Sequence, residues 1–343
     1  MAPLGGCEVP DRHTAMESSG EAGVRRQEGG QATMAEGPRI STVIATYNRP
    51  RSLAACLESL EGQTVAPLEV IIVVDGELTE QVQETIDTFK GDGKLKIVQI
   101  NNGERRGATA SKNRGAEAAS GDIIAFVDDD ISLVPHWTAQ ILKGYEENED
   151  AVAVGGVCEM SQWLFHNPLY RFFVAVRWRL FRNKIGKMSF IGMPYLSHTL
   201  PGDGCVAADF LHGGNMTVLR EAFLATRLDE AMGVRDEFDL CVRLRKNSGR
   251  KLIYNPQAVA YHNVVTSGGF GVWGHERICL DVRDHVPYLM KDYNLRYLRL
   301  GVFSALVLGY ALLTLKPRYV KALWDGIGRY RSWRRSQRAI ASV

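Results

Sequence analysis

Three consecutive carboxylates, Asp128, Asp129 and Asp130, directly follow an apolar run at residues 121–127. A run of this length that is rich in β-branched and aromatic residues indicates a buried strand. Three like charges at the end of a strand raise one another's pKa unless a cation neutralises them. A divalent metal that carries a phosphate ester would do so, because hard cations prefer oxygen ligands. The alternative is a solvated acidic turn that leads into the next helix.

A second acidic group, Asp236, Glu237 and Asp239, precedes an apolar helical segment in the carboxyl-terminal half. Acids at such a place can simply complement the positive end of the helix dipole. Asp239 is expected to be structural and to pair with Arg243. Farther along, His262 ends a strand-like segment at residues 251–262. A lone histidine at such a place serves as a metal ligand or as an ordinary core or surface residue.

Alternating strand-like and helix-like segments would position these groups. Such alternation requires an α/β fold with a mostly parallel sheet and helices on both faces, and ligands bind such sheets beyond the carboxyl ends of the strands. Three polar clusters fall at predicted strand ends, namely 46–48, 75–76 and 128–130. Strands are predicted at 40–45, 68–74, 95–101, 121–127 and 151–158, and helices at 51–63, 78–89, 109–119 and 135–147.

The composition excludes several classes of protein. With 343 residues, 45% of them hydrophobic and 23% charged, the chain can bury a substantial core. A net charge of +2 and the lack of a finger, repeat or basic-aromatic module exclude a nucleic-acid partner. The six cysteines are scattered without a CxxC pair, which predicts reduced thiols of an intracellular protein rather than a zinc site or disulfides. Residues 1–37 contain almost no large apolar side chains and are predicted to form a disordered leader.

Four motifs occur in an order that resembles glycosyltransferase family 2. They are Thr-Tyr-Asn-Arg-Pro at 46–50, Val-Val-Asp-Gly at 73–76, Lys-Asn-Arg-Gly at 112–115 and Val-Asp-Asp-Asp at 127–130. The resemblance covers roughly residues 40–262 and implies a GT-A fold. It also implies transfer of a sugar, with inversion, from a nucleotide-diphosphate sugar to an acceptor hydroxyl. The GT-A domain would span residues 38–265, with a nucleotide-sugar-binding half at 38–158 and an acceptor half at 159–265.

The resemblance assigns the donor side of the site. In the family, the Tyr of the first motif lies by the nucleotide base, and the Asp that ends the second strand accepts the imide hydrogen bond of the base. Free N–H groups at the start of the helix beyond Gly107 suit a diphosphate, with a solvated basic helix face as the alternative. The last carboxylate of the triplet would hold Mn²⁺ or Mg²⁺ together with a histidine, and an earlier one the ribose. The implied nucleotide-sugar-binding residues are Thr46, Tyr47, Asn48, Asp75, Lys112, Arg114, Asp128 and Asp129, and the implied metal ligands are Asp130 and His262.

The acids before the apolar helix resemble the family's Glu-Asp-x-Asp-Leu-x-x-Arg signature, whose second acid is the catalytic base. The first two acids are reversed here, so Glu237 occupies the base position and Asp236 is the alternative. Upstream, two adjacent glycines allow a ligand to approach the backbone closely, or form a bulge or tight turn. Gly213, Gly214 and Asn215 are therefore assigned to the acceptor.

Two segments predict membrane association. Residues 169–184 repeat large apolar side chains at helical spacing among basic ones, which suits an amphipathic helix in an anionic interface or an ordinary helix packed on the sheet. Residues 300–315 carry no charge, and as a helix these 16 residues span about 24 Å, less than the ~30 Å of a hydrocarbon core. A monotopic or re-entrant anchor on the cytoplasmic face is therefore expected in a helical region at 266–343, held by its basic tail. Such a location fits a lipid-linked or polysaccharide acceptor, and the glycine-rich stretch 268–275 suits a mobile lid.

Two other functions are compatible with parts of the pattern. A sugar-phosphate nucleotidyltransferase has a related sheet, but it would need a glycine-rich loop with Arg and Lys after the first strand, which residues 46–50 do not provide. A non-catalytic scaffold subunit would account for the unusual order of Asp236 and Glu237.

Overall fold

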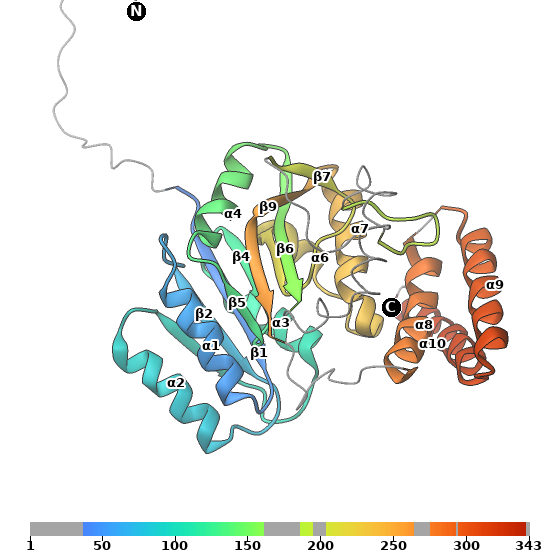
Figure 1. The fold of residues 1–343 in the computed structure, drawn as a ribbon, viewed down its shortest axis with the longest axis horizontal. Coiled ribbons are helices and arrows are strands. Elements are labelled where there is room, and N and C mark those ends of the chain that lie inside the picture. Colours follow the sequence, from blue (N-terminus) through green and yellow to red (C-terminus); the bar gives the residue numbers. More distant parts are fainter. Residues whose placement is uncertain (1–36, 161–185, 195–203, 264–274, 293, 341–343) are drawn as a thin grey trace, which may run out of the picture. The chain divides into compact units, whose positions relative to one another are not determined.

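The computed structural model describes residues 37–160, 186–194, 204–263, 275–292 and 294–340. The chain divides between Gly37 and Pro38, and the fold described below is that of the unit from Pro38 onwards (Figure 1). The strands are β1 (Ile40–Thr46), β2 (Glu69–Val74), β3 (Ile97–Asn101), β4 (Ile123–Val127), β5 (Ile131–Leu133), β6 (Ala151–Met160), β7 (Val206–Ala208), β8 (Asn215–Leu219) and β9 (Lys251–His262). The helices are α1 (Pro50–Glu61), α2 (Glu80–Asp92), α3 (Ala108–Ala118), α4 (Trp137–Glu146), α6 (Arg220–Thr226), the 3-10 helix η3 (Glu230–Arg235), α7 (Asp236–Ser248), α8 (His275–Asp292), α9 (Arg296–Thr314) and α10 (Arg318–Ile340).

The strands form one mixed sheet in the order β3-β2-β1-β4-β8-β6-β9-β5, and β7 pairs with β9. β1 to β4 pair in parallel, because each intervening helix returns the chain to the same edge of the sheet. β8 is antiparallel to both β4 and β6, whereas β6 and β9 are parallel. Strands β1, β2, β3, β4, β6 and β9 therefore run in one direction, as expected for a mostly parallel sheet, whereas β5, β7 and β8 run antiparallel to them.

This topology brings the ends of distant strands to one edge of the sheet. The carboxyl ends of β1, β2 and β4 lie there side by side. β8 begins at the same edge, because Asn215 pairs with Val127 at the end of β4. β9 ends there, and its antiparallel pairing with β5 puts His262 opposite Ile131, the residue after Asp130. The segments that carry most of the predicted site residues therefore meet at this edge.

Successive side chains of the central strands enter two separate cores. Because side chains alternate across a strand, Val43 packs on one face and Ile44 on the other. Helices α1, α2 and α4 cover the Ile44 face, with Leu57 and Trp137 fully buried. Helices α3, α6 and α7 cover the Val43 face, where Phe223 is also fully buried. The sheet thus carries helices on both faces, as expected for the fold.

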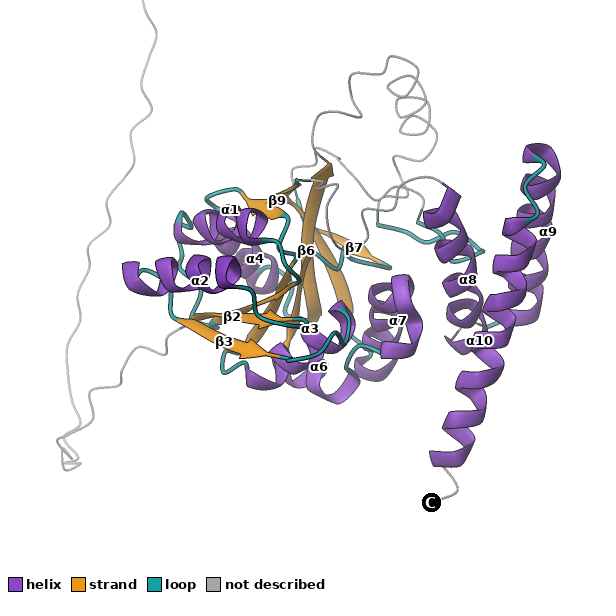
Figure 2. Cartoon of the chain, turned by 90° about the horizontal axis from the view of Figure 1, so that it is seen from below, coloured by secondary structure: helices purple, strands orange, loops and turns teal. Residues whose placement is uncertain are grey.

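The carboxyl-terminal helices α8, α9 and α10 pack against one another (Figure 2). Tyr288, Phe303 and Tyr319 join the core on the Val43 face. Within the described residues, α9 is the one helix long and apolar enough to cross a membrane, judged by length and composition. Its 19 residues rise about 28 Å, so it is longer than the 16-residue segment expected from the sequence and close to the ~30 Å of a hydrocarbon core.

Several element boundaries differ from the sequence predictions. Helix α2 begins at Glu80 rather than at 78 and continues to Asp92, where Gly93 ends it with a φ of +66°. Strand β6 continues two residues beyond the predicted 158. The amphipathic segment at 169–184 and most of the glycine-rich stretch at 268–275 lie outside the described residues.

Candidate active site

The three carboxylates of the triplet point to different partners at the edge of the sheet. Asp128 Oδ1 lies 2.7 Å from the ammonium of Lys112. Asp129 accepts hydrogen bonds from the Thr46 hydroxyl at 2.7 Å and from Arg49 at 2.9 Å. The same Arg49 nitrogen lies 3.0 Å from Asp130 Oδ2. Lys112 and Arg49 therefore hold the three carboxylates in place from both sides. A solvated acidic turn would not need such partners.

The last carboxylate of the triplet, Asp130, also contacts His262. His262 Nε2 lies 3.2 Å from Asp130 Oδ1, as the pairing of β5 with β9 dictates. The hydrogen bond to Asp130 raises the pKa of His262. Burial raises the pKa of Asp129 to about 6, against the opposing effect of Arg49. Burial acts in the same direction on Asp128, but Lys112 holds the pKa of that carboxyl below its ordinary value.

Lys112 connects the triplet to the acidic pair. Its side chain is buried, and its ammonium donates to the carbonyl of Gly213 at 3.2 Å as well as pairing with Asp128. Burial would lower the pKa of Lys112, but the charges of Asp128 and Asp236 raise it above its ordinary value. Lys112 is thus a permanent buried cation in the centre of the site, and not part of a solvated helix face.

Arg114, assigned to the donor together with Lys112, lies elsewhere. It is exposed and donates to the carbonyl of Asn101 at 3.0 Å and to Asn102 Oδ1 at 2.8 Å. Residues two positions apart on a helix face different directions, so Lys112 and Arg114 do not reach the same place. Since Asn102 also donates to Asp75, Arg114 supports the turn around Asp75 rather than the acidic edge.

Asp75, at the end of β2, is buried and holds the turn that leads into α3. Its carboxylate accepts the backbone N–H of Arg106 at 2.7 Å and that of Gly107 at 3.0 Å. These N–H groups would otherwise lack partners at the start of a helix. Each carboxylate oxygen has two lone pairs, so these bonds leave Asp75 with further acceptor capacity.

Tyr47 and Asn48 follow β1 at the neighbouring strand end. The Tyr47 ring is partly exposed, Arg105 lies 4.3 Å above its centroid, and a Cβ on Gly76 would meet the ring at 3.1 Å. Asn48 has a φ of +50°, a backbone conformation that Asn adopts more readily than most residues. The ring therefore forms a flat surface beside the Asp75 turn.

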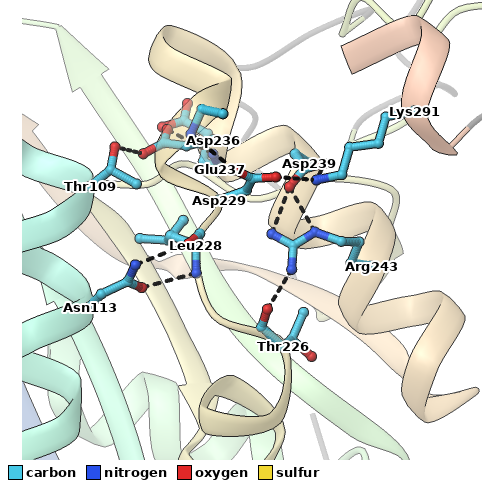
Figure 3. A network of polar contacts seen from close by, with 11 residues as sticks. Thr109, Asn113, Thr226, Leu228, Asp229, Asp236, Glu237, Asp239, Arg243 and Lys291 are labelled. Atoms are coloured by element: carbon cyan, nitrogen blue, oxygen red, sulfur yellow. Dashed lines mark hydrogen bonds and ion pairs between the residues drawn. The ribbon is translucent and has the colours of Figure 1, made fainter. Parts of the chain in front are cut away.

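The acidic pair begins helix α7 on the other side of Lys112. Asp236 accepts the Thr109 hydroxyl at 2.6 Å through Oδ2 and the N–H of Glu237 at 2.8 Å through Oδ1 (Figure 3). Burial raises the pKa of Asp236. Burial, reinforced by the charge of Asp236, also raises the pKa of Glu237 to about 7, against the opposing effect of Lys112. A carboxylate with such a pKa can take up a proton near neutral pH.

Gly213 and Gly214 lie so close to two of these carboxylates that a larger residue would not fit at either position. A Cβ on Gly213 would overlap Glu237 Oε2 and lie 3.2 Å from Cδ of the same side chain. A Cβ on Gly214 would lie 2.6 Å from Asp128 Oδ2. The close approach that the glycine pair indicates is therefore made by the protein's own acids, and it brings the triplet and the acidic pair to neighbouring backbone positions.

Asn215, which the sequence assigns to the acceptor, has partners within the protein. Its side chain is fully buried, its Oδ1 accepts the indole N–H of Trp137 at 2.6 Å, and its Nδ2 donates to the carbonyls of Val157 at 2.7 Å and Ala258 at 3.1 Å. Both N–H donors of this buried amide and its oxygen therefore have partners within the protein. Asn215 joins α4 to the sheet.

Asp239 is structural, as expected. It is fully buried and pairs with Arg243 at 2.7 Å, one helical turn along α7 (Figure 3). Two site residues were missed by sequence reasoning, namely Arg49 and Thr109. Arg49 lies inside the Thr-Tyr-Asn-Arg-Pro motif, which was a usable signal. Thr109 gave none, because its partner Asp236 is 127 positions away in the chain.

The residues present fit a divalent cation. Among the described residues, no three His, Cys, Asp or Glu side chains cluster to hold an ion. Asp130 and His262, however, offer an oxygen and a nitrogen donor next to each other at the open edge of the sheet. Mg²⁺ and Mn²⁺ sites of this kind use one or two protein ligands and take the remaining oxygens from a substrate diphosphate. Asp130 and His262 are thus a suitable pair for that role.

The mixed sheet with helices on both faces and acidic side chains at its carboxyl edge agrees with the GT-A fold that the sequence motifs imply. The sequence model of the family described as "Glycosyl transferase family 2" matches residues 41–221. A glucosyl-dolichyl phosphate glucuronosyltransferase of Haloferax volcanii is 30% identical over 236 residues, which cover 66% of this chain and 69% of that protein. The chain therefore belongs to glycosyl transferase family 2 and is a glycosyltransferase, which disfavours the nucleotidyltransferase and scaffold alternatives.

Two further likenesses agree with this membership. A GalNAc(5)-diNAcBac-PP-undecaprenol beta-1,3-glucosyltransferase of Campylobacter jejuni is 27% identical over 121 residues, 35% of this chain and 38% of that protein. The solved structure of a mannosyltransferase from Pyrobaculum calidifontis, in complex with GDP-Man and Mn²⁺, superposes with a TM-score of 0.55 at 17% identity. The superposition covers 86% of each chain and shows that the GT-A fold is shared.

Proposed function

We propose that this glycosyltransferase moves a sugar from a nucleotide-diphosphate donor to a hydroxyl of a lipid-linked or other glycan acceptor, with inversion and with a divalent metal. The observation that carries the proposal is the convergence of two acidic groups on adjacent glycines. Asp128 lies against Gly214, and Glu237 against Gly213. A donor held at the triplet would therefore have a basic carboxylate beside it.

Glu237 is the better placed general base of the acidic pair. Asp236 uses both of its oxygens, one for Thr109 and one for the N–H of Glu237. Among the described residues, none donates a hydrogen bond to the Glu237 carboxylate, whose pKa burial has raised to about 7. Glu237 would take the proton of the acceptor hydroxyl as its oxygen attacks C1 of the sugar and the bond from C1 to the diphosphate breaks. Attack opposite the leaving group inverts the anomeric carbon.

The remaining residues would bind and orient the donor. Tyr47 and Asp75 would face the base, the triplet would face the ribose and diphosphate, and Arg49 and Lys112 would keep the acids in place. Mn²⁺ or Mg²⁺, when bound by Asp130 and His262, would neutralise the charge that develops on the departing diphosphate. The positions of these groups along one edge of the sheet support the arrangement.

A lipid-linked acceptor is supported by the carboxyl-terminal helices and by the named relatives. α9 exposes large apolar side chains along its length, among them Leu298, Leu306 and Leu313. The flanking segments are basic, with Arg318, Lys321, Arg331 and Arg335 on α10. A surface of this kind binds the anionic cytoplasmic face of a membrane. We accordingly propose a GT-A domain at 38–265, divided at 158, and a membrane-associated region at 266–343.

The assignment is tested by transfer assays on matched variants of the acidic pair. Glu237→Gln should lower kcat about 1,000-fold while the Kd for nucleoside diphosphate, measured by calorimetry, stays unchanged. Asp236→Asn should cost less, because the amide keeps its shape beside Thr109. If instead Asp236→Asn abolishes transfer and Glu237→Gln does not, the two roles are exchanged.

A further inference from the structure

One face of helix α8 contacts the residues that flank the acidic pair. Positions 281, 284, 288 and 291 recur at helical spacing, so their side chains share a face of α8. Asp281 lies 3.5 Å from the guanidinium of Arg235, the residue immediately before the pair. Tyr288 packs against Phe238, the residue immediately after it, with ring centroids 6.2 Å apart. This face of α8 therefore packs against the start of α7.

Asp284, in the middle of that face, holds the turn before the pair. It is fully buried, and its Oδ2 accepts the N–H of Val234 at 3.1 Å. Gly233 has a φ of +60° in this turn, and a Cβ there would overlap the same oxygen. Arg329 of α10 donates to Asp284 Oδ1 at 2.6 Å and to the carbonyl of Ala231 at 2.7 Å. The turn is thus fixed from two carboxyl-terminal helices at once.

Lys291 holds the other side of the pair, two turns farther along α8. Its ammonium lies 2.8 Å from Asp239 Oδ1 and 2.8 Å from Asp229 Oδ2 (Figure 3). Asp239 is fully buried and also pairs with Arg243, so its position along α7 is set by two cations. Asp229 lies just before η3 and its side chain accepts the N–H of Ala231. Lys291 therefore connects the start of η3 with the first turn of α7.

We propose that Asp284 and Lys291 of α8 are positioning residues for the general base, acting through the turn and the helix start that carry Asp236 and Glu237. Because the pair supplies the base only under the proposed function, the positioning role rests on that assignment. Among the described residues, the hydrogen-bond and ion-pair partners of Asp284 and Lys291 do not include the triplet, Tyr47 or Asp75. Loss of either side chain should therefore change kcat and leave the donor KM nearly unchanged. The carboxyl-terminal helices would then serve catalysis as well as membrane binding.

The test compares full-length variants in detergent, with matched controls on α2. Lys291→Met and Asp284→Asn should each lower kcat about tenfold or more, because small displacements of a catalytic group are costly. Lys90→Met and Asp87→Asn make the same substitutions at exposed positions of α2 and should leave kcat unchanged. Thermal unfolding checks that each variant is folded. If Asp284→Asn does not fold, Lys291→Met alone tests the positioning role. This variant is expected to fold, because Asp239 keeps Arg243 as a partner.

A double variant separates positioning from general stabilisation. In a Glu237→Gln background, Lys291→Met should cause no further loss of the residual rate, because a positioning residue acts only through the base. An additional tenfold loss in that background would overturn the positioning role, as would a wild-type kcat for Lys291→Met. A wild-type rate for Glu237→Gln alone would show instead that the base was misassigned, which is a failure of the proposed function.

Discussion

Gly213→Ala tests the close packing of the site with the smallest possible change. An added Cβ would overlap Glu237 Oε2 and lie 3.2 Å from its Cδ and 3.3 Å from its Cβ, so the whole side chain must turn away. Gly213 does not have a positive φ, and alanine therefore causes no backbone strain of its own. Restoring ordinary contact moves the carboxylate by about 1 Å, and a misplacement of that size costs about 100-fold in kcat. This loss corresponds to about 2.7 kcal/mol of transition-state stabilisation.

The assay is steady-state release of nucleoside diphosphate in the presence of acceptor, with kcat and donor KM determined separately. Gly213→Ala should lower kcat and leave the donor KM within about twofold, because Glu237 does not bind the donor. Gly214→Ala pushes against Asp128 and should raise the donor KM as well. Gly91→Ala is the control, since a Cβ there meets nothing within 4 Å. A wild-type kcat for Gly213→Ala in a folded protein would refute the proposed place of Glu237 in the reaction.

The site makes four further predictions. Because Glu237 must be deprotonated and its pKa is raised to about 7, kcat/KM should fall as the pH drops below 7, and a flat profile down to pH 5 would contradict this. Because the pKa of Glu237 is about 7 in the folded state and 4.5 in the unfolded state, the folded protein holds this proton between these pH values and the unfolded protein does not. The free energy of unfolding should therefore fall as the pH rises from about 4.5 to 7. Glu237→Gln, which cannot ionise, should need more urea to unfold than the wild type at about pH 8 but not at about pH 4. Asp130→Ala should remove the stimulation of transfer by Mn²⁺ without changing the circular dichroism spectrum, and undiminished stimulation would show that the ion binds elsewhere. Asn215→Ala should cost about 3 kcal/mol in the free energy of unfolding, because it leaves the indole N–H of Trp137 unpaired, while kcat per folded molecule stays the same.

Much of the fold was predictable because local patterns dictate it. The apolar runs before Asp75 and Asp128 form fully buried strands, and the alternation with helices brings their carboxyl ends together. The order of motifs predicted that the segments carrying the donor-side residues meet, and β1, β2 and β4 do end side by side at one edge of the sheet. The expected pair of Asp239 and Arg243 is present because four residues separate neighbours on a helix face.

Other features depend on packing between distant segments and could not be predicted. Lys112 and Arg114 look equivalent in the sequence, yet one is buried against Asp128 and the other is exposed. Asn215 follows two glycines, as a ligand-binding residue would. Its side-chain oxygen instead accepts a hydrogen bond from the indole N–H of Trp137, which is far away in the chain. The contacts of α8 with α7 and η3 link segments with no shared motif, so only the folded chain reveals them.

The most direct test of the central assignment is transfer from a labelled nucleotide-diphosphate sugar to a polyprenyl-phosphate-linked acceptor by the full-length protein. The wild type should transfer the label in the presence of Mn²⁺, and chelation of the metal should stop it. Glu237→Gln should bind the nucleoside diphosphate with unchanged Kd but transfer the label about 1,000-fold more slowly. Transfer at the wild-type rate by Glu237→Gln would contradict the assignment of this carboxylate as the general base.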